Sequence, residues 1–136
     1  MKLHLLHAKA SMHGVFCLGK EPLSDITPEE SDQLFELIQS LIEYPLHKKT
    51  LLEFSVSEKI SGLCTQSWKK MLHQEMGRFL PKGENAPSWR LWMTEAQMAL
   101  HQHPVNQIRQ EKNKATVDWV WLENPDPRFW KRCFSI

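Results

Sequence analysis

The stretch Trp89-Arg-Leu-Trp-Met-Thr-Glu-Ala-Gln-Met-Ala-Leu-His-Gln-His-Pro-Val-Asn-Gln-Ile-Arg109 decides how the second half of the chain folds. Apolar side chains recur in it at three- and four-residue intervals, which predicts a helix from about Pro87 to His103. Pro104 has no backbone N–H to donate, so we expect the helix to break there. A short helix then continues through Arg109.

Upstream, three kinds of pattern predict further elements. Residues 2–8 and 13–18 are short and mostly apolar, as in strands. Thr27-Pro-Glu-Glu30 combines a capping hydroxyl, a first-turn proline and a capping-box glutamate, and it begins a helix that Pro45 ends. Leu52, Phe54 and Val56 alternate with polar residues, which is the period of a half-buried strand.

The remaining segments complete the predicted fold. We expect another strand over 59–64, a helix that Ser67 caps and Gly77 ends, and a last strand with Trp119 and Trp121 on one face. Residues 127–136 predict a short C-terminal helical tail. Because strands and helices are mixed without strict alternation, we predict a single α+β domain over 1–136, a short, mostly antiparallel sheet packed against three main helices.

Composition is that of a soluble globular protein, with 41% hydrophobic and 24% charged residues among 136. A net charge of +1 gives no field that would attract nucleic acid. Three cysteines without close spacing fit a reducing compartment and argue against a disulfide framework. No apolar run is long enough for a signal peptide or a membrane span, so we expect a cytoplasmic protein.

A cluster of polar side chains around the proline break is the candidate site. It comprises Glu95, Gln97, His103, Asn106 and Arg109, joined by the paired tryptophans Trp119 and Trp121. In one interpretation these groups are structural: Glu95 pairs with Arg109, and His103 satisfies a backbone group freed at the proline. In the other they converge on a ligand, and Arg109 binds an anionic group through its guanidinium fork.

Other chemistries find little support in the sequence. The seven histidines lack a recognised zinc spacing, and no serine or cysteine lies in a nucleophile elbow, so we predict no metal, cofactor or nucleophilic catalysis. The C-terminal tail alternates charged and aromatic residues. It either docks its aromatic side chains on the core or contacts a partner or membrane surface through Arg128, Phe129, Trp130, Lys131 and Arg132.

Four motifs, in this order and spacing, resemble the C-terminal region of the RpfE-type regulatory-protein family, whose bacterial members are often labelled cofactor-independent phosphoglycerate mutase-like. They are Gly77-Arg-Phe-Leu-Pro-Lys-Gly83, Glu95-Ala-Gln-Met98, His103-Pro-Val-Asn106 with Arg109, and Val117-Asp-Trp-Val-Trp121. The resemblance implies a bacterial regulatory protein. Two-metal phosphoryl chemistry needs a set of ligands that this chain does not supply.

We therefore expect a non-catalytic cytoplasmic binding or regulatory domain, whose partner is an unknown protein or a small anionic ligand. The alternative is a small enzyme that acts on a phosphorylated or carboxylated metabolite, with His103 as general base and Arg109 as anion clamp.

Overall fold

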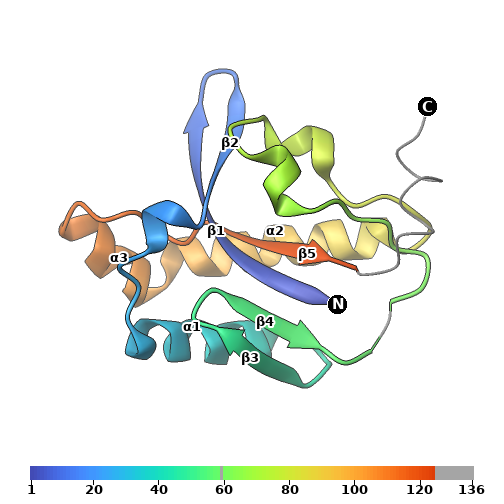
Figure 1. The fold of residues 1–136 in the computed structure, drawn as a ribbon, viewed down its shortest axis with the longest axis horizontal. Coiled ribbons are helices and arrows are strands. Elements are labelled where there is room, and N and C mark those ends of the chain that lie inside the picture. The colour runs from blue at the N-terminus through green and yellow to red at the C-terminus, as the bar shows by residue number, and fades with distance from the viewer. Residues whose placement is uncertain (59, 125–136) are drawn as a thin grey trace.

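The computed structural model describes residues 1–58 and 60–124, which form a five-stranded antiparallel sheet with helices packed against it (Figure 1). The central strand β1 (Lys2–Ser11) pairs with β2 (Gly14–Gly19), β4 (Glu53–Val56) and β5 (Trp119–Glu123). Strand β4 also pairs with the outer strand β3 (Leu46–Thr50). The predicted α+β fold is confirmed.

Three α-helices belong to this part of the chain: α1 (Pro28–Leu41), α2 (Ala86–Gln102) and α3 (Pro104–Glu111). In Figure 1, α1 and α2 lie behind the strands. Helix α1 begins as predicted: the Thr27 hydroxyl accepts from the Glu30 N–H at 3.1 Å, and the Glu30 carboxylate accepts from the Thr27 N–H at 3.0 Å. The predicted break at Pro104 is also confirmed, since α2 ends at Gln102 and α3 starts at Pro104.

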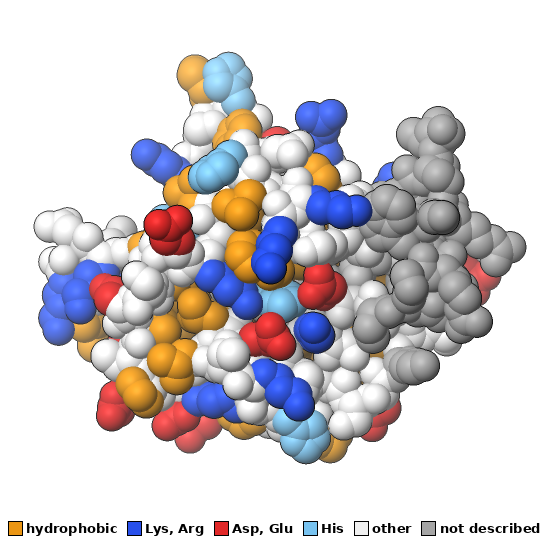
Figure 2. Space-filling model, viewed as in Figure 1, with side chains coloured by type: hydrophobic (Ala, Val, Ile, Leu, Met, Phe, Trp, Pro, Cys, Tyr) orange, Lys and Arg blue, Asp and Glu red, His pale blue; other side chains and the backbone are white. Residues whose placement is uncertain are grey.

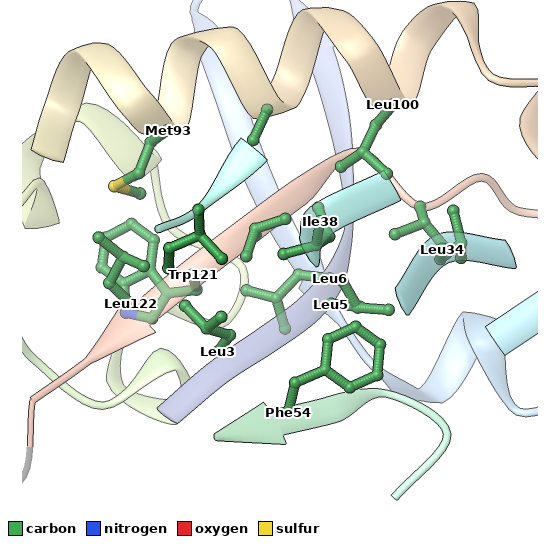
Figure 3. Packing of buried hydrophobic residues seen from close by; sticks show 14 of the residues in the cluster. Leu3, Leu5, Leu6, Leu34, Ile38, Phe54, Met93, Leu100, Trp121 and Leu122 are labelled. Atoms are coloured by element: carbon green, nitrogen blue, oxygen red, sulfur yellow. The ribbon is translucent and has the colours of Figure 1, made fainter. Parts of the chain in front are cut away.

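The hydrophobic core lies between the sheet and these helices (Figure 3). Leu3 of β1 lies opposite both Phe54 of β4 and Leu122 of β5, so the three side chains share one face of the sheet. All three are fully buried. Other members of the core come from α1 and α2, namely Leu34, Ile38, Met93, Ala96 and Leu100.

The predicted helix over 67–77 is wrong. This segment forms two single-turn 3-10 helices, η2 (Trp68–Met71) and η3 (Met76–Phe79), and a third, η1 (Glu21–Leu23), precedes α1. Between η2 and η3 the chain pairs with β2: the Cys17 N–H donates to the Gln74 carbonyl at 3.2 Å, and the His73 N–H donates to the Cys17 carbonyl at 2.7 Å. His73 also has a φ of 63°, which no continuous helix permits. Long-range pairing has replaced the local helical hydrogen bonds.

The predicted strand over 59–64 is also wrong where the structure describes it, because residues 60–64 contain no strand. Besides β1, the strand that pairs with β4 is β3, which precedes it in the chain. After Leu46 the side chains of β3 are exposed, and three of them, His47, Lys48 and Lys49, are basic. An edge strand with no buried alternation has no periodic signal to detect. The predicted helical tail, including Arg128–Arg132, lies outside the described residues.

The number and spacing of the cysteines argue against disulfide bonds, and the structure differs from this prediction at one cysteine. Cys17 is a buried free thiol, and burial raises its pKa. Cys64 is disulfide-bonded. The argument from cysteine spacing against a disulfide is therefore wrong for Cys64. Within the described ranges, every helix is too short or too polar to span a lipid bilayer.

Replacement of Leu34 tests the packing of α1 on the sheet, because the Leu34 side chain has no exposed surface. We expect Leu34→Ala to lower the free energy of unfolding by about 3 kcal/mol, because it leaves a cavity in the core. The control is Gln33→Ala at the neighbouring exposed position, where a change below about 0.5 kcal/mol is expected. Chemical denaturation measures both, and equal small effects would contradict this packing.

Candidate functional site

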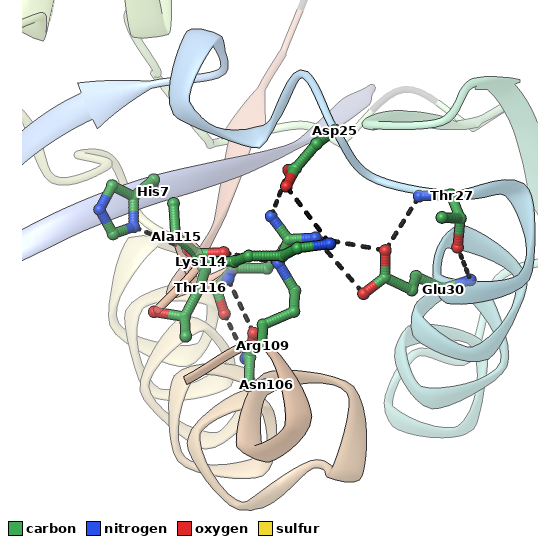
Figure 4. Close-up of polar contacts among 10 residues, drawn as sticks. His7, Asp25, Thr27, Glu30, Asn106, Arg109, Lys114, Ala115 and Thr116 are labelled. Carbon is green, nitrogen blue, oxygen red and sulfur yellow. Dashed lines mark hydrogen bonds and ion pairs between the residues drawn. The ribbon is translucent and has the colours of Figure 1, made fainter. Parts of the chain in front are cut away.

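Arg109 of α3 lies at the centre of a buried polar cluster, and its side chain is 1% exposed (Figure 4). Nε donates to the Ala115 carbonyl at 2.6 Å, and Nη1 lies 3.2 and 3.3 Å from the two carboxylate oxygens of Glu30. Nη2 donates to Asp25 Oδ1 at 2.5 Å and, by this hydrogen bond, lowers the pKa of the Asp25 carboxyl. One guanidinium thus joins α3, the start of α1 and the loop that leads to β5.

Asn106, one turn earlier on α3, is buried and satisfied at both ends of its amide. Its Nδ2 donates to the carbonyls of Leu100 at 2.8 Å and Val117 at 2.7 Å, while its Oδ1 accepts from the Val117 N–H at 2.8 Å. The side chain therefore fastens the last turn of α2 to the residue that leads into β5. Its contacts stabilise the fold.

The other predicted side chains on the two helices do not join this cluster. His103 caps α3, because its Nδ1 accepts from the Val105 N–H at 3.1 Å, and burial lowers its pKa. Glu95 is exposed on α2, and the acids that contact Arg109 are Asp25 and Glu30 instead. Gln97 is half-buried.

Trp119 and Trp121 share one face of β5, opposite Leu6 and His4 of β1, and point away from the helical core. Trp121 is fully buried, and its Nε1 donates to the Gln66 carbonyl at 2.8 Å. Trp119 is half-buried, and its Nε1 has no partner within the described ranges. The seven predicted residues are thus divided between the two sides of the sheet.

Beside the α2–α3 break lie two adjoining hollows of about 490 and 400 Å³, which share His101 and Asp118. We call them together the polar groove. Two of the predicted residues line it, Gln97 in the smaller hollow and Asn106 in the larger. His7 of β1 and Asn113, in the loop after α3, also line it.

His7 and Asp118 form an ordered pair in this groove. Asp118 Oδ2 accepts from His7 Nδ1 at 2.8 Å and from the Ala8 N–H at 2.9 Å, while Oδ1 accepts from the Thr116 hydroxyl at 2.7 Å. His7 Nδ1 also lies 2.8 Å from the Thr116 carbonyl, so two acceptors hold a proton on Nδ1. The hydrogen bond to Asp118 raises the pKa of His7 despite partial burial.

The remaining nitrogen of His7 is available. Nε2 makes no hydrogen bond to any described residue, and the side chain is 19% exposed. Asp118 is the one carboxylate among the residues that line the groove, and its oxygens already accept three donors. The groove therefore offers imidazole and amide donors to a ligand without a competing free acid.

The residues that sequence reasoning missed are Asp25, Glu30, His7 and Asp118. Glu30 had a visible signal as the capping-box residue, but that signal did not reveal its contact with Arg109, 79 positions away. His7 and Asp118 are 111 positions apart, so no local pattern indicates their pairing. Only the antiparallel register of β1 and β5 brings them together.

A second charged cluster lies on the face of the sheet seen in Figure 2, where acidic, basic and histidine side chains gather over the central strands. His4 Nδ1 lies 2.9 Å from Lys20 Nζ, and His4 Nε2 lies 2.7 Å from Glu123 Oε2. Burial lowers the pKa of Lys20, and the hydrogen bond to His4 lowers the pKa of Glu123. Because both nitrogens of the buried His4 have a partner, we assign this cluster to the stability of the sheet.

Comparison of the chain with protein-family models, with curated proteins and with solved structures finds no match. Within the part of the chain that the structure describes, no three His, Cys, Asp or Glu side chains are grouped as ligands for a metal ion.

Replacement of Arg109 tests its role in the fold. We expect Arg109→Ala to lower the free energy of unfolding by about 3 kcal/mol, because it leaves the buried acceptors around it without their donor. Arg90→Ala, at an exposed position on α2, is the matched control and should change stability by less than about 0.5 kcal/mol. Similar denaturation midpoints for the two variants would contradict the assignment.

The raised pKa of His7 predicts a pH dependence of stability. A raised folded-state pKa stabilises the protein below the pKa of the unfolded chain, and this contribution is lost as the pH rises through the folded-state value. We therefore expect the stability difference between the wild type and His7→Gln to be larger at about pH 6 than at about pH 8. His47→Gln, exposed on β3, is the control. Parallel stability curves for wild type and His7→Gln would count against the pairing with Asp118.

Proposed function

We propose that this chain is a non-catalytic binding domain that takes a small anionic ligand in the polar groove. The observation that carries the proposal is the His7–Asp118 pair. Asp118 directs the imidazole through Nδ1 and raises its pKa, while Nε2 remains free to donate. A protonated imidazole with one free N–H is a charge-assisted donor for a carboxylate or phosphate.

The other residues that line the groove also favour a negatively charged ligand. His101 lines both hollows, and the amides of Gln97, Gln110 and Asn113 supply further donors. The protonated imidazole of His7 neutralises the Asp118 carboxylate in part, and the Thr116 hydroxyl donates a further hydrogen bond to it. A cation would find no unoccupied carboxylate among these residues, whereas an anion would find several donors.

A binding role is better supported than the enzymatic alternative with His103 as base and Arg109 as clamp. Arg109 is 1% exposed and already donates to Asp25, Glu30 and Ala115, so it has no surface for a substrate anion. His103 Nδ1 is engaged as the cap of α3. The regulatory role and the cytoplasmic location stay predictions from the sequence and from the resemblance to the RpfE-type family.

A protein is the second candidate partner, favoured by two exposed side chains on α2. Leu91 and Met98 are each 60% exposed and lie seven residues apart, so they share one side of the helix. Met98 also lines the smaller hollow of the polar groove. A protein bound along α2 would therefore cover the groove or contribute to it.

Titration with inorganic phosphate and with citrate, followed by amide NMR, tests the proposal. We expect shifts at the groove residues, and binding that tightens as the pH falls through the raised pKa of His7. His7→Gln should weaken binding about tenfold, since a charge-assisted hydrogen bond contributes about 1.5 kcal/mol. His13→Gln, in the exposed turn between β1 and β2, is the matched control and should leave binding unchanged. Shifts elsewhere, or equal effects of the two variants, would overturn the proposal.

A further inference from the structure

A third hollow, of about 530 Å³, lies between the end of α1 and the start of α2. Tyr44, Trp89 and Trp92 line it together with Glu43, and we call it the aromatic hollow. Trp89 and Trp92 lie in the N-terminal half of α2, whereas the polar groove adjoins the C-terminal half at Gln97–Gln102. The two sites share no lining residue and can be tested separately.

The Trp89 ring packs against both Tyr44 and Trp92 in a defined arrangement. Tyr44 and Trp89 are nearly parallel, with 16° between their planes and 6.5 Å between their centroids. Trp92 meets Trp89 at 65° with centroids 5.8 Å apart. Trp92 Nε1 donates to the Leu41 carbonyl at 2.6 Å, which holds that indole against the end of α1. The hollow thus has an ordered aromatic wall, whose ring faces carry negative electrostatic potential.

Two further features contribute negative charge to the hollow. Helix α1 ends at Leu41 with no basic residue in its last turn, so its terminal carbonyls carry partial negative charge there, and among them the Leu41 carbonyl accepts from Trp92 Nε1. Glu43 lies two residues after the end of α1, is exposed, and makes no hydrogen bond or ion pair with the residues that the structure describes. No lysine, arginine or histidine is among the residues that line the hollow.

The first turn of α2 brings backbone N–H groups with partial positive charge to the other side of the hollow, while two of its side-chain donors bond within the protein. Asn85 Nδ2 donates to the Ser61 carbonyl at 2.7 Å, and Ser88 Oγ donates to the Asn85 carbonyl at 3.0 Å. Each of these two side-chain donors is therefore engaged within the protein. The partial charges of the two helix ends oppose each other, so the negative character of the hollow comes from the ring faces and from the Glu43 carboxylate.

We propose that the aromatic hollow is a binding site for an organic cation of the methylated or quaternary ammonium class. Such a cation is large and weakly hydrated, so it can lie against aromatic faces, where it is attracted by their electrons. A small metal ion would need several oxygen ligands, and Glu43 is the one carboxylate in the lining. The polar groove takes a ligand of the opposite charge, so this inference does not depend on the proposed function.

The test compares choline with its neutral carbon isostere, in which a tert-butyl group replaces the trimethylammonium group. The two ligands have nearly the same shape, so a difference in affinity reports the charge. We expect choline to shift the amide NMR signals and the indole fluorescence of the hollow, and to bind about fivefold more tightly than the isostere. Equal binding of both ligands, or no shift at the hollow with millimolar choline, would overturn the proposal.

Variants of the hollow sharpen the result. Glu43→Gln removes the charge at an exposed position, so we expect the fold to persist and the preference for choline to fall severalfold. Trp89→Leu should abolish choline binding in a protein whose NMR spectrum shows that it remains folded. Glu36→Gln, an exposed acid on α1 outside the lining, is the matched control and should bind choline like the wild type. An unchanged preference for choline in Glu43→Gln would contradict the charge argument.

Discussion

The buried guanidinium of Arg109 is the constraint on which the arrangement of helices around the sheet depends. A charge removed from water must have partners, and this one has Asp25, Glu30 and the Ala115 carbonyl on three separate segments. Such a cluster need not stabilise the protein more than an apolar one would. Its geometry, however, allows one relative placement of α1, α3 and the loop before β5. Glu30 also caps α1, so the position of the helix is coupled to the position of the arginine.

That constraint extends to the polar groove. Arg109 and Asn106 hold residues 115 and 117, which flank Thr116, and Asp118 follows directly. The loop is therefore positioned where Asp118 meets His7 of β1. Arg109 and Asn106, predicted as ligand-binding residues, thus hold the backbone beside the groove. The groove itself is lined by Gln97 and Asn106 together with His7 and Asp118, which the sequence did not indicate. Buried polar groups order the site, while partly exposed ones remain available to a ligand.

Helix α2 connects the two proposed sites and differs in character along its length. Its N-terminal half contributes Trp89 and Trp92 to a hollow beside the negative end of α1. Its C-terminal half contributes Gln97 and His101 to a groove with imidazole and amide donors. Between them Met93, Ala96 and Leu100 keep one face on the core. Because the ends of a helix of 17 residues are about 25 Å apart, ligands of opposite charge can bind without contact.

Local rules were sufficient for the elements with strong periodicity or a specific start and stop. The capping box at Thr27, the proline break at 104 and the strand over Trp119–Glu123 have local sequence signals, and each was predictable. Residues 67–79 were not, because their backbone pairs with β2 and long-range hydrogen bonds replace a local helix. The candidate site was likewise predictable in part from the sequence and in part only from the tertiary structure. Its residue types and the region around the break were evident from the sequence. Only tertiary structure decided that Arg109 is buried by acids 79 and 84 positions away and that His7 meets Asp118, because such contacts depend on strand register and helix packing.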